Sequence, residues 1–113
     1  MSTYVQEVIV TVTDGSRFTV YISSAQGSTQ FELEVFWREP QFALSRVDVP
    51  IVHASAEVAF NEAIVAVKSY LSKVAANVLT IDSPCNDPFV KKPVQAAVLG
   101  RNGISVSPTV NGS

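Results

Sequence analysis

The strongest constraint on this fold is the alternation of apolar and polar residues in three segments near the start of the chain. Residues 4–13, 17–22 and 29–38 each place apolar side chains at every second position. A period of two is that of a β-strand with one buried and one open face. Asp14-Gly15, between the first two segments, is a pair typical of hairpin turns. The sequence therefore predicts consecutive antiparallel strands joined by short turns.

The need to keep the apolar residues on one face selects the length of each turn. A three-residue turn over 14–16 pairs residue 12 with residue 18, so that the apolar residues of both strands share a face. The even-length loop 25–28 pairs residue 22 with residue 31 and preserves the same face. These turns fix the predicted register of the first three strands.

A fourth alternating segment, residues 46–53, contains Pro50. Proline has no N–H to donate, so this strand should lie at a sheet edge or carry a bulge. Residues 4–53 are thus predicted to form a four-stranded antiparallel meander. Its expected inner face comprises Val8, Val10, Val12, Phe18, Val20, Ile22, Phe31, Leu33, Val35, Trp37, Val47, Val49 and Ile51.

The segment 55–78 has the spacing of an amphipathic helix. Ser55 stands where an N-cap is expected, and Glu57 lies in the first turn, where the helix dipole favours a negative charge. The apolar stripe covers about a third of the helix circumference and consists of Ala56, Phe60, Ala63, Ile64, Val67, Tyr70, Leu71, Val74 and Val78. A helix with such a stripe is the natural cover for the inner face of the sheet.

Residues 79–113 are predicted to be a loop and tail, because prolines and turn-forming residues follow the helix. The apolar runs 94–99 and 104–106 are joined by Gly100-Arg101-Asn102-Gly103, and Asn-Gly is a strong hairpin signal. A short hairpin over 94–107 could extend the sheet or pair with a neighbouring subunit; a loosely ordered end is the alternative. The whole chain, 1–113, is expected to be one α+β domain, a meander sheet with one long helix across one face.

Few residues could support catalysis, because the chain has one histidine and one cysteine. His53 and Glu57 flank the predicted start of the helix, whereas Cys85 and Asp87 follow its end. A helix over 55–78 is about 36 Å long, so the two pairs begin far apart. Metal-ligand spacings such as CxxC or HxxxH are lacking, and the glycines fit turns. We expect no enzyme, no metal site and no cofactor.

Glu32 and Glu34 share the outer face of the third strand. Paired carboxylates can act as acid and base when their pKa values are pushed apart. On an open sheet face, ordinary solvated carboxylates are the favoured interpretation.

The expected outer face mixes apolar and charged groups. The predicted registers place Ile9 beside Tyr21 and Arg17 beside Phe36. Apolar residues that the helix cannot cover make a candidate interface of Val5, Ile9, Tyr21, Phe36 and Val52. We therefore expect a homo-oligomer, most simply a closed dimer, or contact with an unknown protein partner.

A small ligand or single-stranded nucleic acid is the alternative occupant of this face. Tyr21 and Phe36 could stack on bases while arginines hold phosphates, namely Arg17, Arg38 and Arg46. Acidic groups on the same face would repel phosphates, namely Glu7, Glu32, Glu34 and Asp48. The net charge of −2, from ten acidic and eight basic residues, also disfavours nucleic acid and membrane surfaces.

The start of the chain has no basic region followed by an apolar run, and apolar stretches are far shorter than the roughly 20 residues that span a bilayer. A single cysteine allows no internal disulfide. We therefore expect a cytoplasmic protein without a membrane segment.

Overall fold

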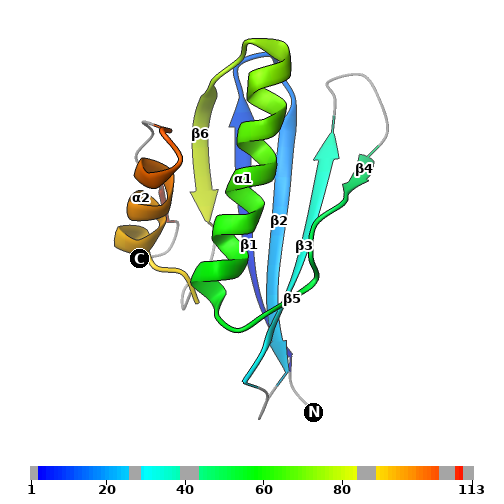
Figure 1. Ribbon diagram of the computed structural model, residues 1–113, viewed down its shortest axis with the longest axis vertical. Helices are drawn as coiled ribbons and strands as arrows, with labels where there is room; N and C mark the ends of the chain where they lie inside the picture. Colours follow the sequence, from blue (N-terminus) through cyan, green and yellow to red (C-terminus); the bar gives the residue numbers. More distant parts are fainter. Residues whose placement is uncertain (1–2, 26–28, 39–43, 84–88, 105–108, 111–113) are drawn as a thin grey trace.

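The computed structural model describes residues 3–25, 29–38, 44–83, 89–104 and 109–110. Its sheet has the strand order β4-β3-β2-β1-β6-β7, with β5 also paired to β3. The strands are β1 (Thr3–Val12), β2 (Arg17–Ala25), β3 (Phe31–Arg38), β4 (Leu44–Val47), β5 (Val52–His53), β6 (Val78–Ser83) and β7 (Thr109–Val110). All pairs are antiparallel except β6 with β7. With helix α1 (Ala56–Val74) packed on the sheet (Figure 1), the α+β class with an antiparallel sheet is confirmed.

The first hairpin turn keeps the predicted faces but not the predicted register. Val12 donates its N–H to the carbonyl of Ser16 at 2.9 Å, and Gly15 donates to Val12 at 2.9 Å. The three-residue turn therefore consists of residues 13–15, with Gly15 at a φ of 92°, which glycine adopts without a Cβ clash. Val10 pairs with Phe18 rather than with residue 20. A slip of two residues leaves every side chain on the same face of the sheet. The requirement that apolar residues share one face therefore could not distinguish the observed register from the predicted one.

The same two-residue slip separates the predicted and observed pairing of β2 with β3. Ile22 lies opposite Leu33, not opposite residue 31. The expected edge strand over 46–53 is two short strands, β4 and β5, both paired to β3. Pro50 lies in the interruption, where Ile51 still accepts a 2.7 Å hydrogen bond from the N–H of Leu33.

Helix α1 begins as predicted and ends earlier. The Ser55 hydroxyl accepts the N–H of Val58 at 3.2 Å, which confirms the N-cap. The helix ends at Val74, and Ala75 takes a left-handed conformation with a φ of 52°. The expected end at residue 78 is wrong because Val78 opens β6, which pairs with β1.

The core lies between α1 and the inner face of the sheet. Phe60 and Val67 are fully buried, as expected, but Leu71 is only half-buried. Val74 is 44% exposed and Ile51 46% exposed, so their predicted burial is wrong. The fully buried apolar residues of the three central strands are Val8, Val10, Val12, Phe18, Val20, Ile22, Leu33 and Val35.

The predicted hairpin over residues 94–107 is wrong, because helix α2 (Lys92–Arg101) occupies most of that range. Pro93 lies in its first turn, a position that proline favours. Asn102 and Gly103, predicted as a turn, instead end the helix, and Gly103 has a φ of 75°. Val98 and Leu99 are buried in the core, so the apolar residues of α2 find their partners within their own chain. Residues 105–107 of the predicted hairpin lie outside the described residues.

Two buried glutamines hold the segment that leads into α2. The Gln6 amide donates to Ser83 Oγ at 2.9 Å and to the Val90 carbonyl at 3.1 Å, and its oxygen accepts the Val90 N–H at 2.8 Å. Gln95 donates to the same carbonyl at 2.9 Å. Gln6 is 1% exposed and Gln95 0%. This network fastens the start of α2 to β1.

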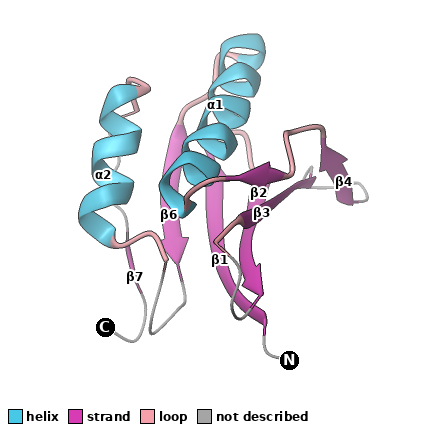
Figure 2. Cartoon of the chain, turned by 60° about the horizontal axis from the view of Figure 1, so that its bottom comes forward, coloured by secondary structure: helices cyan, strands magenta, loops and turns pink. Residues whose placement is uncertain are grey.

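Both helices lie on the same side of the sheet (Figure 2). Arg101 in α2 and Glu57 in α1 form an ion pair at 3.0 Å, and the Asn102 amide donates to Asn61 at 3.1 Å. In the described part of the chain, the opposite side of the sheet is left without a covering element.

Candidate functional site

The face of the sheet opposite the helices carries the candidate interface. We call it the outer face and define it, from the strand registers, as Val5, Glu7, Ile9, Thr11, Arg17, Thr19, Tyr21, Ser23, Glu32, Glu34, Phe36, Arg38, Arg46, Val52, Thr80 and Asp82. These side chains alternate along each strand with the buried inner residues. The alternation is the reason that one strand serves the core and the outer face at once.

Three of the five predicted interface residues form an apolar centre on the outer face. Tyr21 and Phe36 meet edge to face, with ring centroids 5.9 Å apart and planes inclined by 74°. Ile9 lies in the same cross-strand row as Phe36, separated from it by Thr19. All three are half-buried. They form a partly covered apolar patch of the kind found at interface centres.

The other two predicted interface residues lie at one end of the outer face. Val5 is 53% exposed and Val52 is 55% exposed. Both belong to one cross-strand row, in which Ser23 and Glu32 stand between them. The structure therefore places them on the expected face without joining them to one another.

The predicted neighbours of Tyr21 are corrected by the register. Tyr21 pairs with Glu7 on β1 and with Glu34 on β3, whereas Ile9 pairs with Thr19. Burial raises the pKa of Tyr21, and its hydrogen bond to the Glu7 carboxylate and the charges of Glu7 and Glu34 raise it further. The phenol therefore stays neutral and donates to an acidic neighbour.

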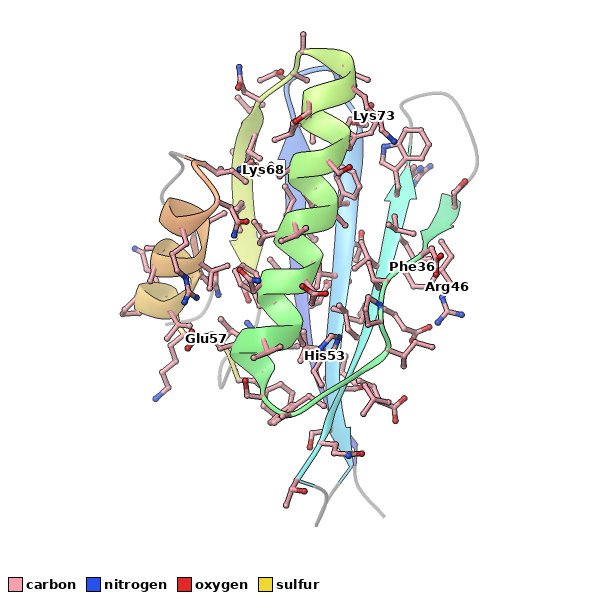
Figure 3. All side chains as sticks on the ribbon, in the orientation of Figure 1. Phe36, Arg46, His53, Glu57, Lys68 and Lys73 are labelled. Carbon is pink, nitrogen blue, oxygen red and sulfur yellow. The ribbon has the colours of Figure 1, made fainter. Side chains whose placement is uncertain are left out.

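Arginines occupy the other end of the outer face. Arg17 pairs directly with Arg38, not with Phe36 as predicted, and both are exposed. Arg46 pairs with Phe36 at the β3–β4 edge (Figure 3) and forms a 3.6 Å ion pair with Glu34. The carboxylates Glu32 and Glu34 are both exposed, as the solvated interpretation requires.

The residues considered for catalysis have separate roles. His53 is 8% exposed, and its Nε2 lies 2.7 Å from the Pro50 carbonyl. Glu57, four residues later, is instead paired with Arg101. Cys85 and Asp87 lie outside the described residues. No group of three His, Cys, Asp or Glu side chains able to hold a metal occurs among the residues that the structure describes.

A polar cluster that the sequence reasoning missed joins the first hairpin to α1. Tyr70 donates to Asp14 Oδ2 at 2.6 Å, while Ser16 donates through its N–H and its hydroxyl to Asp14 Oδ1. Hydrogen bonds from Ser16 and then from Tyr70 lower the pKa of the Asp14 carboxyl. Tyr70 also packs on Phe18 and Trp37, each with ring centroids 5.3 Å apart. The position of Asp14 two residues before Ser16 is a local sequence signal for an Asx-turn. No local pattern indicates that Tyr70, far away on the helix, is the second partner of Asp14.

A cleft of about 460 Å³ lies where the end of α1, the start of β6 and the end of α2 meet. Its described lining has one charged group, Lys68, together with Ser72, Asn77, Asn102 and apolar side chains. The arrangement brings no acid–base pair together among these residues. It therefore gives no basis for assigning a reaction to the cleft.

Neither of the two described helices is both long and apolar enough to cross a bilayer. Comparison of the chain with protein-family models, with curated proteins and with solved structures gives no match.

Proposed function

We propose that this chain is a small, non-catalytic interaction module that self-associates as a closed dimer through its outer face. The observation that carries the proposal is the half-buried cluster of Ile9, Tyr21 and Phe36 on a face that no described element covers. Tyrosine and other aromatic residues dominate the centres of protein interfaces, and a polar rim around them excludes water. Glutamates and arginines supply such a rim here.

The size of the molecule is compatible with this assembly. Its two longer extents are 41 and 28 Å, and the sheet lies roughly in that plane (Figure 1). A stable interface needs about 800 Å² from each partner, a large part of one sheet face of this size. Because α2 packs within its own chain, the outer face, and not the tail, supports the proposal.

Single-stranded nucleic acid is the weaker candidate for the same face. Arg17 and Arg38 could hold phosphates, but Glu7, Glu32 and Glu34 lie on that face too. Carboxylates at contact range would cancel much of the electrostatic term on which such binding depends. The single cysteine agrees with a cytoplasmic setting, which we include in the proposal.

The test is the mass in solution at about 50 µM, measured by light scattering or sedimentation, with circular dichroism to follow the fold. We expect twice the 12.1 kDa of one chain. Tyr21→Glu should yield a folded monomer, since it places a charge inside the apolar centre. Val65→Glu is the matched control, because Val65 is 45% exposed on α1, away from the outer face, and this variant should remain dimeric.

A wild-type monomer would overturn the proposal, and so would a Tyr21→Glu variant as dimeric as Val65→Glu. If Tyr21→Glu fails to fold, Thr19→Arg tests the neighbouring row of the face, between Ile9 and Phe36, and should dissociate the dimer. A wild-type monomer that shifts the anisotropy of a labelled single-stranded oligonucleotide would replace the proposal with the nucleic-acid candidate.

A further inference from the structure

The charges of the outer face are segregated along the strands. The cross-strand rows nearest the start of β1 hold Glu7, Glu32 and Glu34, which we call the acidic end. The row nearest the end of β1 holds Arg17 and Arg38, which we call the basic end. Ile9, Thr19 and Phe36 form the row between them.

Two further charged groups lie beside that middle row and do not change the polarity. Arg46 pairs with Phe36 on β4 and forms an ion pair with Glu34, which leaves Glu7 and Glu32 as the charges of the acidic end without an ion pair among the described residues. Asp82 of β6 pairs with Ile9 of β1 and adds a negative charge to the middle row. The face therefore runs from acidic to basic along the strand direction, with an apolar row in the middle.

The basic end repels itself within one copy of the chain. Arg17 and Arg38 stand directly opposite each other, and neither forms an ion pair with another described residue. At the acidic end, Glu7 and Glu34 lie two strands apart, with Tyr21 of β2 between them. Like charges opposite one another on neighbouring strands destabilise a sheet, and charges of opposite sign from a partner would relieve this repulsion.

A two-fold axis that stacks two outer faces must lie in the plane between them. If the axis runs along the strands, each acidic end faces the acidic end of its partner. If it runs across the strands, each acidic end faces a basic end, and the apolar middle rows meet near the axis. Stacked sheets lie about 10 Å apart, so charged side chains from both faces can reach one another.

Building on the proposed self-association, we infer that two copies stack their outer faces with strands antiparallel, acidic end over basic end. Rotation about an axis across the strands keeps β3 over β3 of the partner copy. Glu32 near its start then faces Arg38 near its end, and the reverse contact occurs on the other side of the axis. This pair sets the orientation of the dimer.

Salt gives the first test, because its effect on the dissociation constant has opposite signs in the two orientations. Between 50 and 500 mM NaCl, screening removes attraction in the antiparallel stack, so the wild-type dimer should weaken several-fold. In the parallel stack, screening removes repulsion and the dimer would strengthen. A dissociation constant that falls with salt would overturn the inference.

Charge reversal on β3 gives the second test. Arg38→Glu and Glu32→Arg should each weaken the dimer about tenfold, since each change occurs twice across the axis and sets like charges together. The double variant, with both substitutions, should recover the wild-type dissociation constant to within about threefold. Lys68→Glu is the matched control, because Lys68 is an exposed side chain on α1 (Figure 3), and it should leave the dissociation constant unchanged.

The two proposals fail in different ways. Arg38→Glu also removes the repulsion from Arg17, so its melting temperature should not fall, and its loss of association does not reflect unfolding. If Tyr21→Glu breaks the dimer while Arg38→Glu strengthens it or leaves it unchanged, the orientation is refuted and self-association stands. A wild-type chain that is monomeric at every salt concentration refutes both.

Discussion

The two buried glutamines give a sharp test of how polar groups stabilise this fold. Gln6 and Gln95 are both buried and both donate to the Val90 carbonyl. Gln6 makes three hydrogen bonds with its amide, whereas Gln95 has a buried oxygen that finds no hydrogen-bond partner among the described residues. The same substitution to methionine, an unbranched side chain of similar shape, should therefore have very different consequences at the two positions.

The magnitude follows from the bonds that each substitution removes. A net contribution of about 1 kcal/mol for each hydrogen bond gives about 3 kcal/mol for Gln6→Met. The N–H of buried Val90 then lacks its acceptor, an added cost that the burial of the methionine side chain partly offsets. Gln95→Met should cost less than about 1 kcal/mol, because it removes one bond and also the unpartnered oxygen.

Urea unfolding followed by circular dichroism measures both free energies. With an m value of about 1.5–2 kcal/mol/M, Gln6→Met should lower the midpoint by about 1.5–2 M. Amide hydrogen exchange gives a local readout, because the N–H of Val90 loses its acceptor only in the Gln6 variant. A Gln6→Met cost under 1 kcal/mol, or one equal to that of Gln95→Met, would refute the reasoning from counted hydrogen bonds.

Three further outcomes are expected. Tyr70→Phe should lower the free energy of unfolding by about 1 kcal/mol at pH 7 and by less at pH 2. The pKa of Asp14 is lowered in the folded state, so the stabilisation by its carboxylate is lost as the pH falls through that lowered value. Equal costs at both pH values in urea titrations would contradict this. Ile64→Ala should cost about 2–5 kcal/mol and half-buried Leu71→Ala clearly less, so equal losses in thermal unfolding would place Leu71 deeper in the core. Ser55→Ala should cost about 1 kcal/mol through loss of the N-cap, and an unchanged melting temperature would show that the cap is dispensable.

The faces of the strands and the start of the helix are determined by the sequence alone. Alternation has a period of two, so the inward set from Val8 to Val35 follows without knowledge of the partners. The Ser55 cap is equally local, because its acceptor and the N–H of Val58 lie three residues apart. The candidate interface residues could be placed on the outer face for the same reason.

The register and the C-terminal elements depend on contacts that local patterns do not contain. A slip of two residues keeps every face, so only the turn over residues 13–15 and the packing between strands select the true pairing. Val78 continues the helical spacing, yet pairing with β1 draws it into β6. The short apolar run of α2 is compatible with a strand or a helix until Pro93 and the contacts with α1 decide.

The segregation of charge on the outer face also depends on tertiary structure. The sequence shows Glu7, Arg17 and Arg38 as isolated charges on separate strands. Only the observed register sets the two arginines opposite each other and places the glutamates beside Tyr21. Side-chain identity determines which face a residue occupies, whereas its neighbours on that face are decided by hydrogen-bonded pairing between strands far apart in the chain.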